Sequence, residues 1–522
     1  MGMSWVISGR RAAPGLRFGI AAALAGIAGP VMGDPFFFTP GDIVVTVEGN
    51  GSNTASGGTA ATGNTANPNT YMDGEASPLT LYEFNTSGVK QTPVATLTLP
   101  TVTVGANSVI SGEYGSSSEG TLQRTGDGHA LTLAGYGIGA FDYNSKYDVD
   151  GNGTALAQSC NWTGCSGAPQ VPRVIAVIGA DGTVDTSTVL NNIASTNNPR
   201  SVWSPDGKSF YISGQASGNA GDPTGGTFYI PAKGPGQTPV AVTGADATGK
   251  TVYQDTREVT VVNNTLYVSS GTKQGSGNTR GFVGTLGSPP ATGLYQGGAG
   301  PTQLPNFGST SAGRINLGAT NGNSLNANLQ INLSPENFFF ANATTLYVAD
   351  DGKPKNTSAS SGLGDGGLQK WSLDKTTGMW KLDYTLFDGL GLVANTNSHG
   401  ISGLYGLTGQ DITVNGVDMV ELFATSYTLG DTDPSYLFGI TDFLLDTADG
   451  SLDGKFIELA DAPADTTFKG VAFAPIPAPE PATLALLGVG LLGFAAVRRG
   501  RGLKENGAGR TGEILLRGQA PS

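Results

Sequence analysis

The chain has 522 residues and carries 28 Lys and Arg against 41 Asp and Glu, a net charge of −13. A chain this acidic repels the phosphate backbone, which argues against sequence-independent nucleic-acid binding. Its two histidines exclude the zinc motif HExxH and any histidine-rich metal site, and its 81 Gly and 29 Pro favour many turns.

The N-terminus predicts a secretory signal peptide. Three arginines within residues 10–17 precede an apolar stretch of 11 residues at 18–28, which is too short to span a bilayer. Small residues follow, so we expect cleavage near Gly33 and removal of residues 1–33 on export. An uncleaved N-terminal anchor is the alternative.

Residues 34–475 predict an all-β exported domain. Short runs of β-branched and aromatic residues alternate with turns of Gly, Asn, Asp and Ser, and no long stretch has a helical period. A first strand that ends in a turn, followed by a second strand rich in Leu, Tyr and Val, recurs along the chain. A third strand usually follows, and some repeats offer a fourth, which is the content of a propeller blade. The second strands align on Thr132, Tyr211, Tyr267, Tyr347 and Phe423.

The two ends of this domain complete each other. Residues 468–475 form a first strand with no second strand after it, and residues 43–49 form a second strand with no first strand before it. The segments 79–84 and 94–99 supply a third and a fourth strand. One blade built from both chain ends closes a ring, so we predict a single β-propeller of about six four-stranded blades. Seven blades or paired β-sandwiches are the alternatives.

A loop rich in Asp, Asn and Gly lies between the first two repeats. Asp148, Asp150 and Asn152 occupy alternate positions and Gly153 is the sixth residue, a spacing that resembles the start of a Ca²⁺ loop. Ser159 stands where a bidentate Glu is expected, and an ordinary polar turn is the alternative. No other cofactor is expected.

The two cysteines of the chain, Cys160 and Cys165, enclose four residues. This spacing predicts a disulfide that closes a tight loop in an oxidising compartment, in agreement with export. Redox catalysis is the alternative.

The domain carries no convincing catalytic motif. Residues 244–251 fit the P-loop pattern, but a β-prone segment follows where that motif requires a helix. His399, at the start of a repeat, is the candidate base for the alternative function, a secreted propeller hydrolase or lyase acting on polysaccharide or another small substrate. A central funnel of ionisable residues would favour this enzyme, whereas a funnel of neutral polar and aromatic groups would favour binding.

The C-terminus has the most specific pattern in the chain. A Pro-Glu-Pro hinge precedes 16 apolar residues at 482–497, and an arginine cluster follows. A helix of this length spans about 24 Å, short against a hydrocarbon core of about 30 Å, and the arginines would stay on the cytoplasmic side. We therefore expect a membrane helix at 482–497. The flanking signal residues are Pro479, Glu480, Pro481, Arg498, Arg499 and Arg501.

This order of elements resembles the PEP-CTERM sorting signal of exported proteins in Gram-negative bacteria. The resemblance covers about residues 476–501 and implies that an exosortase recognises the tail and processes the protein at the cell surface. Residues 502–522 depart from the family pattern, because a polar extension follows the arginine cluster. An ordinary membrane anchor is the alternative.

These features together predict an exported cell-surface or extracellular-matrix protein that the C-terminal helix anchors in the membrane, transiently or permanently. The propeller would act as a binding or spacing module, with an exopolysaccharide as the expected partner and no nucleic acid. A non-enzymatic role fits the absence of a catalytic motif better than an enzymatic one.

Overall fold

The computed structural model divides into two compact units, Met1–Phe36 and Phe37–Ser522. The predicted signal peptide (1–33) and the predicted membrane helix (482–497) lie outside the described residues. Among the residues that are described, no helix is long and apolar enough to cross a membrane. The structure describes residues 36–49, 71–148, 153–217, 222–242, 255–270, 281–289, 301–307, 315–316, 330–331, 333–352, 366–394, 397–448 and 454–478.

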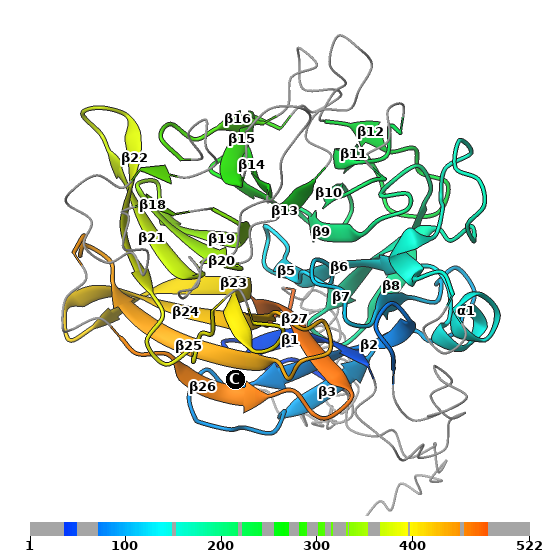
Figure 1. Cartoon of the computed structure of the whole chain (residues 1–522), viewed down its shortest axis with the longest axis horizontal. Helices are drawn as coiled ribbons and strands as arrows, with labels where there is room; N and C mark the ends of the chain where they lie inside the picture. The colour runs from blue at the N-terminus through cyan, green and yellow to red at the C-terminus, as the bar shows by residue number, and fades with distance from the viewer. Residues whose placement is uncertain are drawn as a thin grey trace, which may run out of the picture. The chain divides into compact units, whose positions relative to one another are not determined.

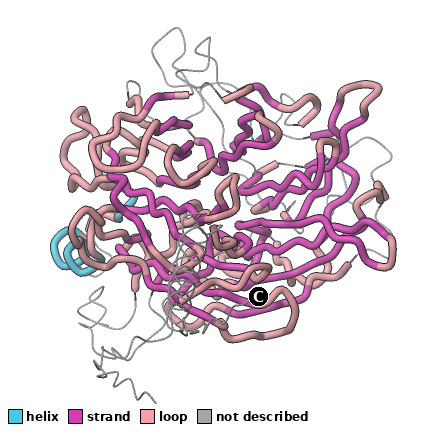
Figure 2. Tube along the Cα trace, turned by 180° about the vertical axis from the view of Figure 1, so that it is seen from behind, coloured by secondary structure: helices cyan, strands magenta, loops and turns pink. Residues whose placement is uncertain are grey.

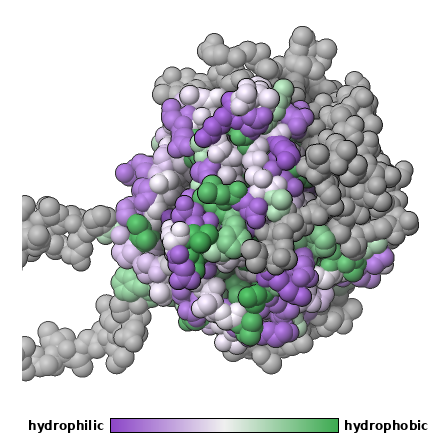
Figure 3. All heavy atoms as spheres, turned by 90° about the vertical axis from the view of Figure 1, so that its left-hand side faces the viewer, coloured by the Kyte–Doolittle hydropathy of each residue, from purple (hydrophilic) through white to green (hydrophobic). Residues whose placement is uncertain are grey.

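The second unit is all-β, as predicted. Figure 2 shows strands and loops almost throughout, and the helices of the described part are α1 (Ala140–Tyr147) and the short η2 (Leu156–Gln158). Both helices fall in the long connection between β6 and β7, outside the repeats. Figure 3 shows hydrophilic and hydrophobic residues interspersed on the face that it presents.

The described residues form four separate four-stranded antiparallel sheets, each paired in chain order from first to fourth strand. The predicted alignment residues Tyr211, Tyr267, Tyr347 and Phe423 all lie on second strands. The sheets are β9 (Pro199–Trp203), β10 (Phe210–Gly214), β11 (Gly226–Ile230) and β12 (Val240–Ala241); β13 (Thr256–Val262), β14 (Thr265–Ser270), β15 (Phe282–Gly287) and β16 (Thr302–Gln303); β19 (Pro335–Asn342), β20 (Thr345–Asp350), β21 (Gly367–Asp374) and β22 (Met379–Leu386); and β23 (Ile401–Val414), β24 (Val417–Thr428), β25 (Tyr436–Phe443) and β26 (Ile457–Asp461).

Local turn chemistry joins the first two strands of these sheets. Asn263 and Asn264 connect β13 to β14 with φ angles of 48° and 58°. Asparagine tolerates this left-handed region better than most residues, and two such residues in succession give the tight turn that suits a hairpin.

The two ends of the domain pair with each other, as the sequence predicts. They do so within a sheet of nine strands. β1 pairs with β27 antiparallel, with Ile43 opposite Phe473, and β1 also pairs with β2. The sheet has the order β27-β1-β2-β4-β6-β7-β8, with β3 on β2 and β5 on β6. Its strands are β1 (Ile43–Gly49), β2 (Ala76–Phe84), β3 (Ala95–Thr98), β4 (Ser111–Glu113), β5 (Gln123–Arg124), β6 (Ala130–Tyr136), β7 (Arg173–Gly179), β8 (Val184–Leu190) and β27 (Thr466–Phe473). A small pair, β17 (Ile315–Asn316) and β18 (Gln330–Ile331), stands apart.

The described residues form four separate four-stranded sheets, not the predicted six or so. The short strand β4 pairs with both β2 and β6. This bridge merges the strands on its two sides into the single nine-stranded sheet.

The sheets follow one another in a propeller-like arrangement (Figure 1). The inner strands β5, β9, β13, β19, β23 and β27 neighbour each other in this order, and β27 lies against β5. Apolar cores fill the space between neighbouring sheets. On β20, Leu346 and Val348 pack toward the β13–β16 sheet, whereas Tyr347 and Ala349 pack toward the β23–β26 sheet. Because side chains alternate along a strand, both faces of each sheet are buried, and the centre is left to the inner strands.

Candidate functional site

The inner strands carry ionisable side chains into the centre at one end. Arg200 of β9, Arg257 of β13, Glu336 of β19, Tyr405 of β23 and Lys469 of β27 are each no more than 6% exposed. With their buried neighbours they form what we call the central cluster, which consists of Glu48, Glu119, Arg200, Asp255, Arg257, Glu336, Asp351, Tyr405 and Lys469.

The two arginines of the central cluster are paired with acids. Arg200 contacts Asp255, and Arg257 Nη1 lies 2.7 Å from Glu336 Oε1 and 3.1 Å from Asp351 Oδ2. Burial lowers the pKa of Arg257, but Glu336 and Asp351 more than offset it and raise that pKa above its usual value. Burial also raises the pKa of Glu336 to about 8, against the attraction of Arg257. Both carboxyl groups therefore lie against one guanidinium, which offsets part of the cost of burying them.

The acids near Lys469 are held by an ion-pair contact at Glu48 and by hydrogen bonds at Glu119. Lys469 Nζ lies 3.5 Å from Glu48 Oε2, and burial raises the pKa of Glu48 well above its usual value. Glu119 accepts hydrogen bonds from the Tyr136 hydroxyl at 2.7 Å and from Asn198 Nδ2 at 2.9 Å. Tyr405 donates its hydroxyl to the Glu119 carbonyl at 2.7 Å. These contacts join the inner strands β23 and β27 to other segments that are distant in the sequence.

Access to the central cluster is small in the described structure. Tyr405, Tyr427, Asp431 and Lys469 help to line a hollow of about 20 Å³, enough for one water molecule. The ionisable residues predicted for an enzyme are thus present at the centre, but each cation lies against an acid and all of them are buried. Their arrangement is suited to holding the inner strands together.

His399 does not belong to the central cluster. Its Nδ1 lies 2.7 Å from Asp433 Oδ1, and its side chain is 77% exposed. Burial raises the pKa of Asp433, but hydrogen bonds from Gly400 N and His399 more than offset it, and the pKa is lowered. The pair stands at the rim of a separate cavity of about 450 Å³, which Val393 and Tyr436 help to line.

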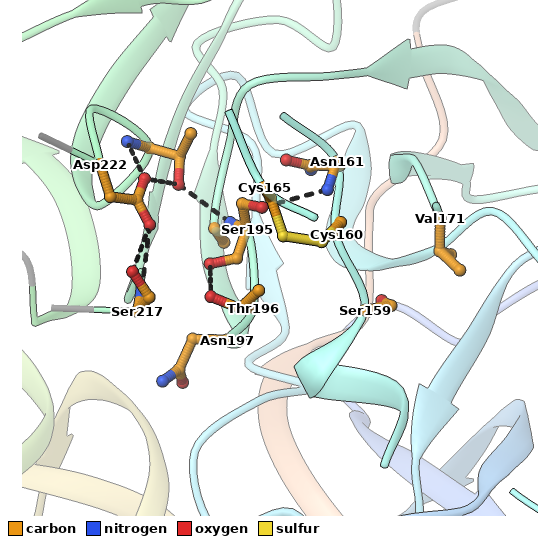
Figure 4. Close-up of a disulfide and its surroundings, with 12 residues drawn as sticks. Ser159, Cys160, Asn161, Cys165, Val171, Ser195, Thr196, Asn197, Ser217 and Asp222 are labelled. Atoms are coloured by element: carbon orange, nitrogen blue, oxygen red, sulfur yellow. Dashed lines mark hydrogen bonds between the residues drawn. A yellow bond between two sulfur atoms is a disulfide. The ribbon is translucent and has the colours of Figure 1, made fainter. Parts of the chain in front are cut away.

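Cys160 and Cys165 are joined by a disulfide with a Cα–Cα distance of 6.0 Å (Figure 4). Asn161 N donates to Ser195 Oγ at 3.1 Å beside it. The buried Arg173 guanidinium donates to the Ser159 carbonyl at 3.0 Å. The bond therefore closes a loop that is also fixed by buried hydrogen bonds.

The candidate Ca²⁺ loop is described only at its ends. Asp148 follows α1 directly, and its Oδ1 accepts a hydrogen bond from Gly153 N at 2.7 Å. Asp150 and Asn152 lie outside the described residues, and the residues that are described contain no group of three metal-ligating side chains. The Ca²⁺ loop stays a prediction.

The sequence analysis missed the central cluster, although a signal for it exists. Aligned by their first strands, the repeats place a polar residue two positions before an apolar one. Each apolar residue lies in a different core between sheets, whereas the polar residue points to the centre. The pairs are Arg200 with Val202, Arg257 with Val259, Glu336 with Phe338, Tyr405 with Leu407 and Lys469 with Val471.

The segment after β27 leads directly into the C-terminal tail. Ala474 N donates to the Asp42 carbonyl at 2.8 Å, and Ile476 N donates to the Gly128 carbonyl at 2.9 Å. The family model described as the PEP-CTERM protein-sorting motif matches residues 477–499. The chain carries a PEP-CTERM sorting motif. The motif thus begins at the residue after the last backbone contact that fixes the closing segment.

Comparison with solved structures gives weak likenesses. No curated protein matches the chain. The chain covers 58% of the Bacteroides ovatus protein described as Xyloglucan PUL GH43B, which covers 70% of this chain at 14% identity and a TM-score of 0.32. An oligogalacturonate lyase in complex with manganese is 8% identical, with a TM-score of 0.30. The match covers 67% of this chain and 86% of the lyase. The β-propeller domain of the Trilobed protease from Pyrococcus furiosus is 8% identical, with a TM-score of 0.24. The match covers 64% of this chain and 100% of that domain. Scores this low carry no information about ligand or activity.

Proposed function

We propose that the chain is an exported cell-surface or extracellular-matrix protein, sorted and processed through its PEP-CTERM motif, whose propeller acts as a binding or spacing module. The observation that carries this proposal is the motif at 477–499, placed directly after the closing strand β27. An exosortase is the processing partner that the motif implies. Residues 482–497 would hold the protein in the membrane before processing.

The fold supports processing without loss of the propeller. β27 is paired with β1, and the closing segment ends its backbone contacts at Ile476. Cleavage within the motif would therefore remove no strand of the described sheets.

The central cluster is ionisable, as expected of the enzyme, but its burial leaves no open funnel for a substrate at the centre of the described structure. Its charges are paired and buried, and the hollow above it holds about one water. The alternative hydrolase or lyase draws its support from the His399–Asp433 pair, the geometry of a base oriented by a carboxylate. That pair lies beside its own cavity.

We further infer that the nine-stranded sheet represents two merged blades, which would bring the blade count to six. One is the path β27-β1-β2-β3, and the other is β5-β6-β7-β8. Each begins with one of the inner strands, in the same manner as the four separate sheets.

The intact mass of the protein from fractionated host cells tests the proposed function. We expect a species that begins near Asp34 and ends near Pro479–Pro481. Glu480→Ala should leave the tail in place, whereas the matched variant Glu505→Ala, in the polar extension, should be processed normally. A wild-type protein that keeps residues 482–522 would contradict processing and leave a membrane-anchored protein.

A further inference from the structure

Next to the central cluster, the inner strands line another cavity. It measures about 230 Å³, and β5, β13, β19, β23 and β27 all contribute to its wall. On β13, β19, β23 and β27, the residues that line this cavity follow, in sequence, the residue that belongs to the central cluster. We call it the axial cavity, and Figure 1 shows these strands around the centre.

The axial cavity contains an unpaired buried acceptor. Asn337 is 3% exposed, and its Oδ1 has no hydrogen-bond partner among the described residues. A buried carbonyl oxygen without a donor is unfavourable and calls for an explanation in a native fold. A ligand hydroxyl in the cavity would supply the missing donor.

Other polar groups of the cavity are placed for the same kind of ligand. Glu258 is 6% exposed, and its Oε2 accepts a hydrogen bond from Phe338 N. Burial raises the pKa of Glu258 well above its usual value, which favours the protonated carboxyl, a group that both donates and accepts hydrogen bonds. Thr260 and Thr408 add hydroxyl groups to the wall.

Apolar residues of β19 and β23, whose side chains also pack into the cores between the sheets, complete the wall. Phe338, Phe339 and Phe340 of β19 line the cavity together with Leu407 of β23. A few hydrogen-bonding groups set among apolar and aromatic ones are typical of small-molecule sites. The volume lies below the about 300–1,000 Å³ of sites for drug-sized ligands, so the cavity suits a single ring.

The charge of the site argues for a neutral ligand. Arg124 is the positively charged residue among those that line the cavity, and it is exposed. Its guanidinium donates a hydrogen bond to the Ala474 carbonyl at 3.4 Å. The interior offers an amide, a buried carboxyl and hydroxyls, and the chain as a whole carries −13. A ring with several hydroxyls and no charge matches these groups.

We propose that the axial cavity binds one neutral sugar ring of a saccharide, with hydroxyls hydrogen-bonded to Asn337, Glu258 and Thr408 and its carbon atoms against the apolar part of the wall. This inference rests on the proposed function as a binding module and names its ligand class. It differs from the central cluster, where cations and carboxylates lie in ion-pair contact with one another.

Saturation-transfer NMR on the full exported protein tests the ligand class, with glucose, galactose and mannose as neutral probes and glucuronate as the charged comparison. Saturable binding of a neutral sugar, stronger than that of glucuronate, is the expected result. No saturable binding, or a preference for glucuronate, would overturn the proposal. The intact mass from cells tests sorting separately, so a correctly sorted protein that binds no sugar would reject this site and leave the proposed function standing.

Asn337→Leu tests the site itself. It removes the unpaired oxygen at similar volume, so we expect sugar affinity to fall about fivefold or more while the unfolding temperature stays equal or rises. Retained affinity together with a lower unfolding temperature would assign Asn337 a structural role and overturn the proposal.

Thr408→Val provides a second test at nearly constant shape. It should also weaken binding about fivefold, whereas the control Thr413→Val, exposed further along β23, should not. Equal affinity of these two variants would place any binding site elsewhere.

Discussion

Arg257 shows how strongly single residues fix the centre of this protein. Its guanidinium contacts Glu336 and Asp351, and it also donates to the Pro335 carbonyl at 3.2 Å. Removing one partner of a buried ion pair leaves the other charge uncompensated, so Arg257→Met should lower the free energy of unfolding by about 3–5 kcal/mol. Urea denaturation measures the change. Lys208→Met, which breaks an exposed pair with Asp206, should leave the urea midpoint unchanged, and equal effects of the two variants would contradict this role.

At the scale of elements, the sequence predicted what repeats in its apolar pattern. The second strands and the β1–β27 closure have strong β patterns, and both were predicted. The bridge β4 could not be predicted, because Ser111–Glu113 is three residues long and carries no pattern. The central cluster was missed for a different reason. Arg200, Arg257 and Glu336 sit inside strands, where the sequence pattern favours apolar residues. Only the ring of inner strands brings them together with the other members of the cluster.

The closure by β1 supports an element-scale prediction. Val45 is fully buried and lies opposite Tyr82 on β2 and Val471 on β27. Val45→Pro removes a backbone N–H from a strand paired on both sides, so we expect a loss of about 3 kcal/mol or more. Val45→Ala keeps that N–H and should lose less. Limited proteolysis near residues 474–478, scored by mass, should increase only in the proline variant; equal cleavage of both variants would refute the closure as the stabilising element.

The buried acids make the stability of the whole molecule depend on pH. Burial raises the pKa of Glu336 to about 8 and that of Asp383 to about 6, and it also raises the pKa of Glu258. A carboxyl with a raised folded-state pKa binds its proton more tightly in the folded chain than in the unfolded one. Its contribution is fully present below the unfolded pKa and is lost as pH rises through the folded value.

The unfolding temperature should therefore fall between roughly pH 5 and pH 8, the window in which Asp383 and then Glu336 would ionise. Calorimetry across this range measures it. Glu336→Gln keeps a neutral side chain at every pH, so its unfolding temperature should fall less steeply, above all between pH 6 and pH 8. Because Glu336 lies against Arg257, a variant with the wild-type slope would mean that the pair is ionised in the folded protein, with Arg257 holding the carboxylate.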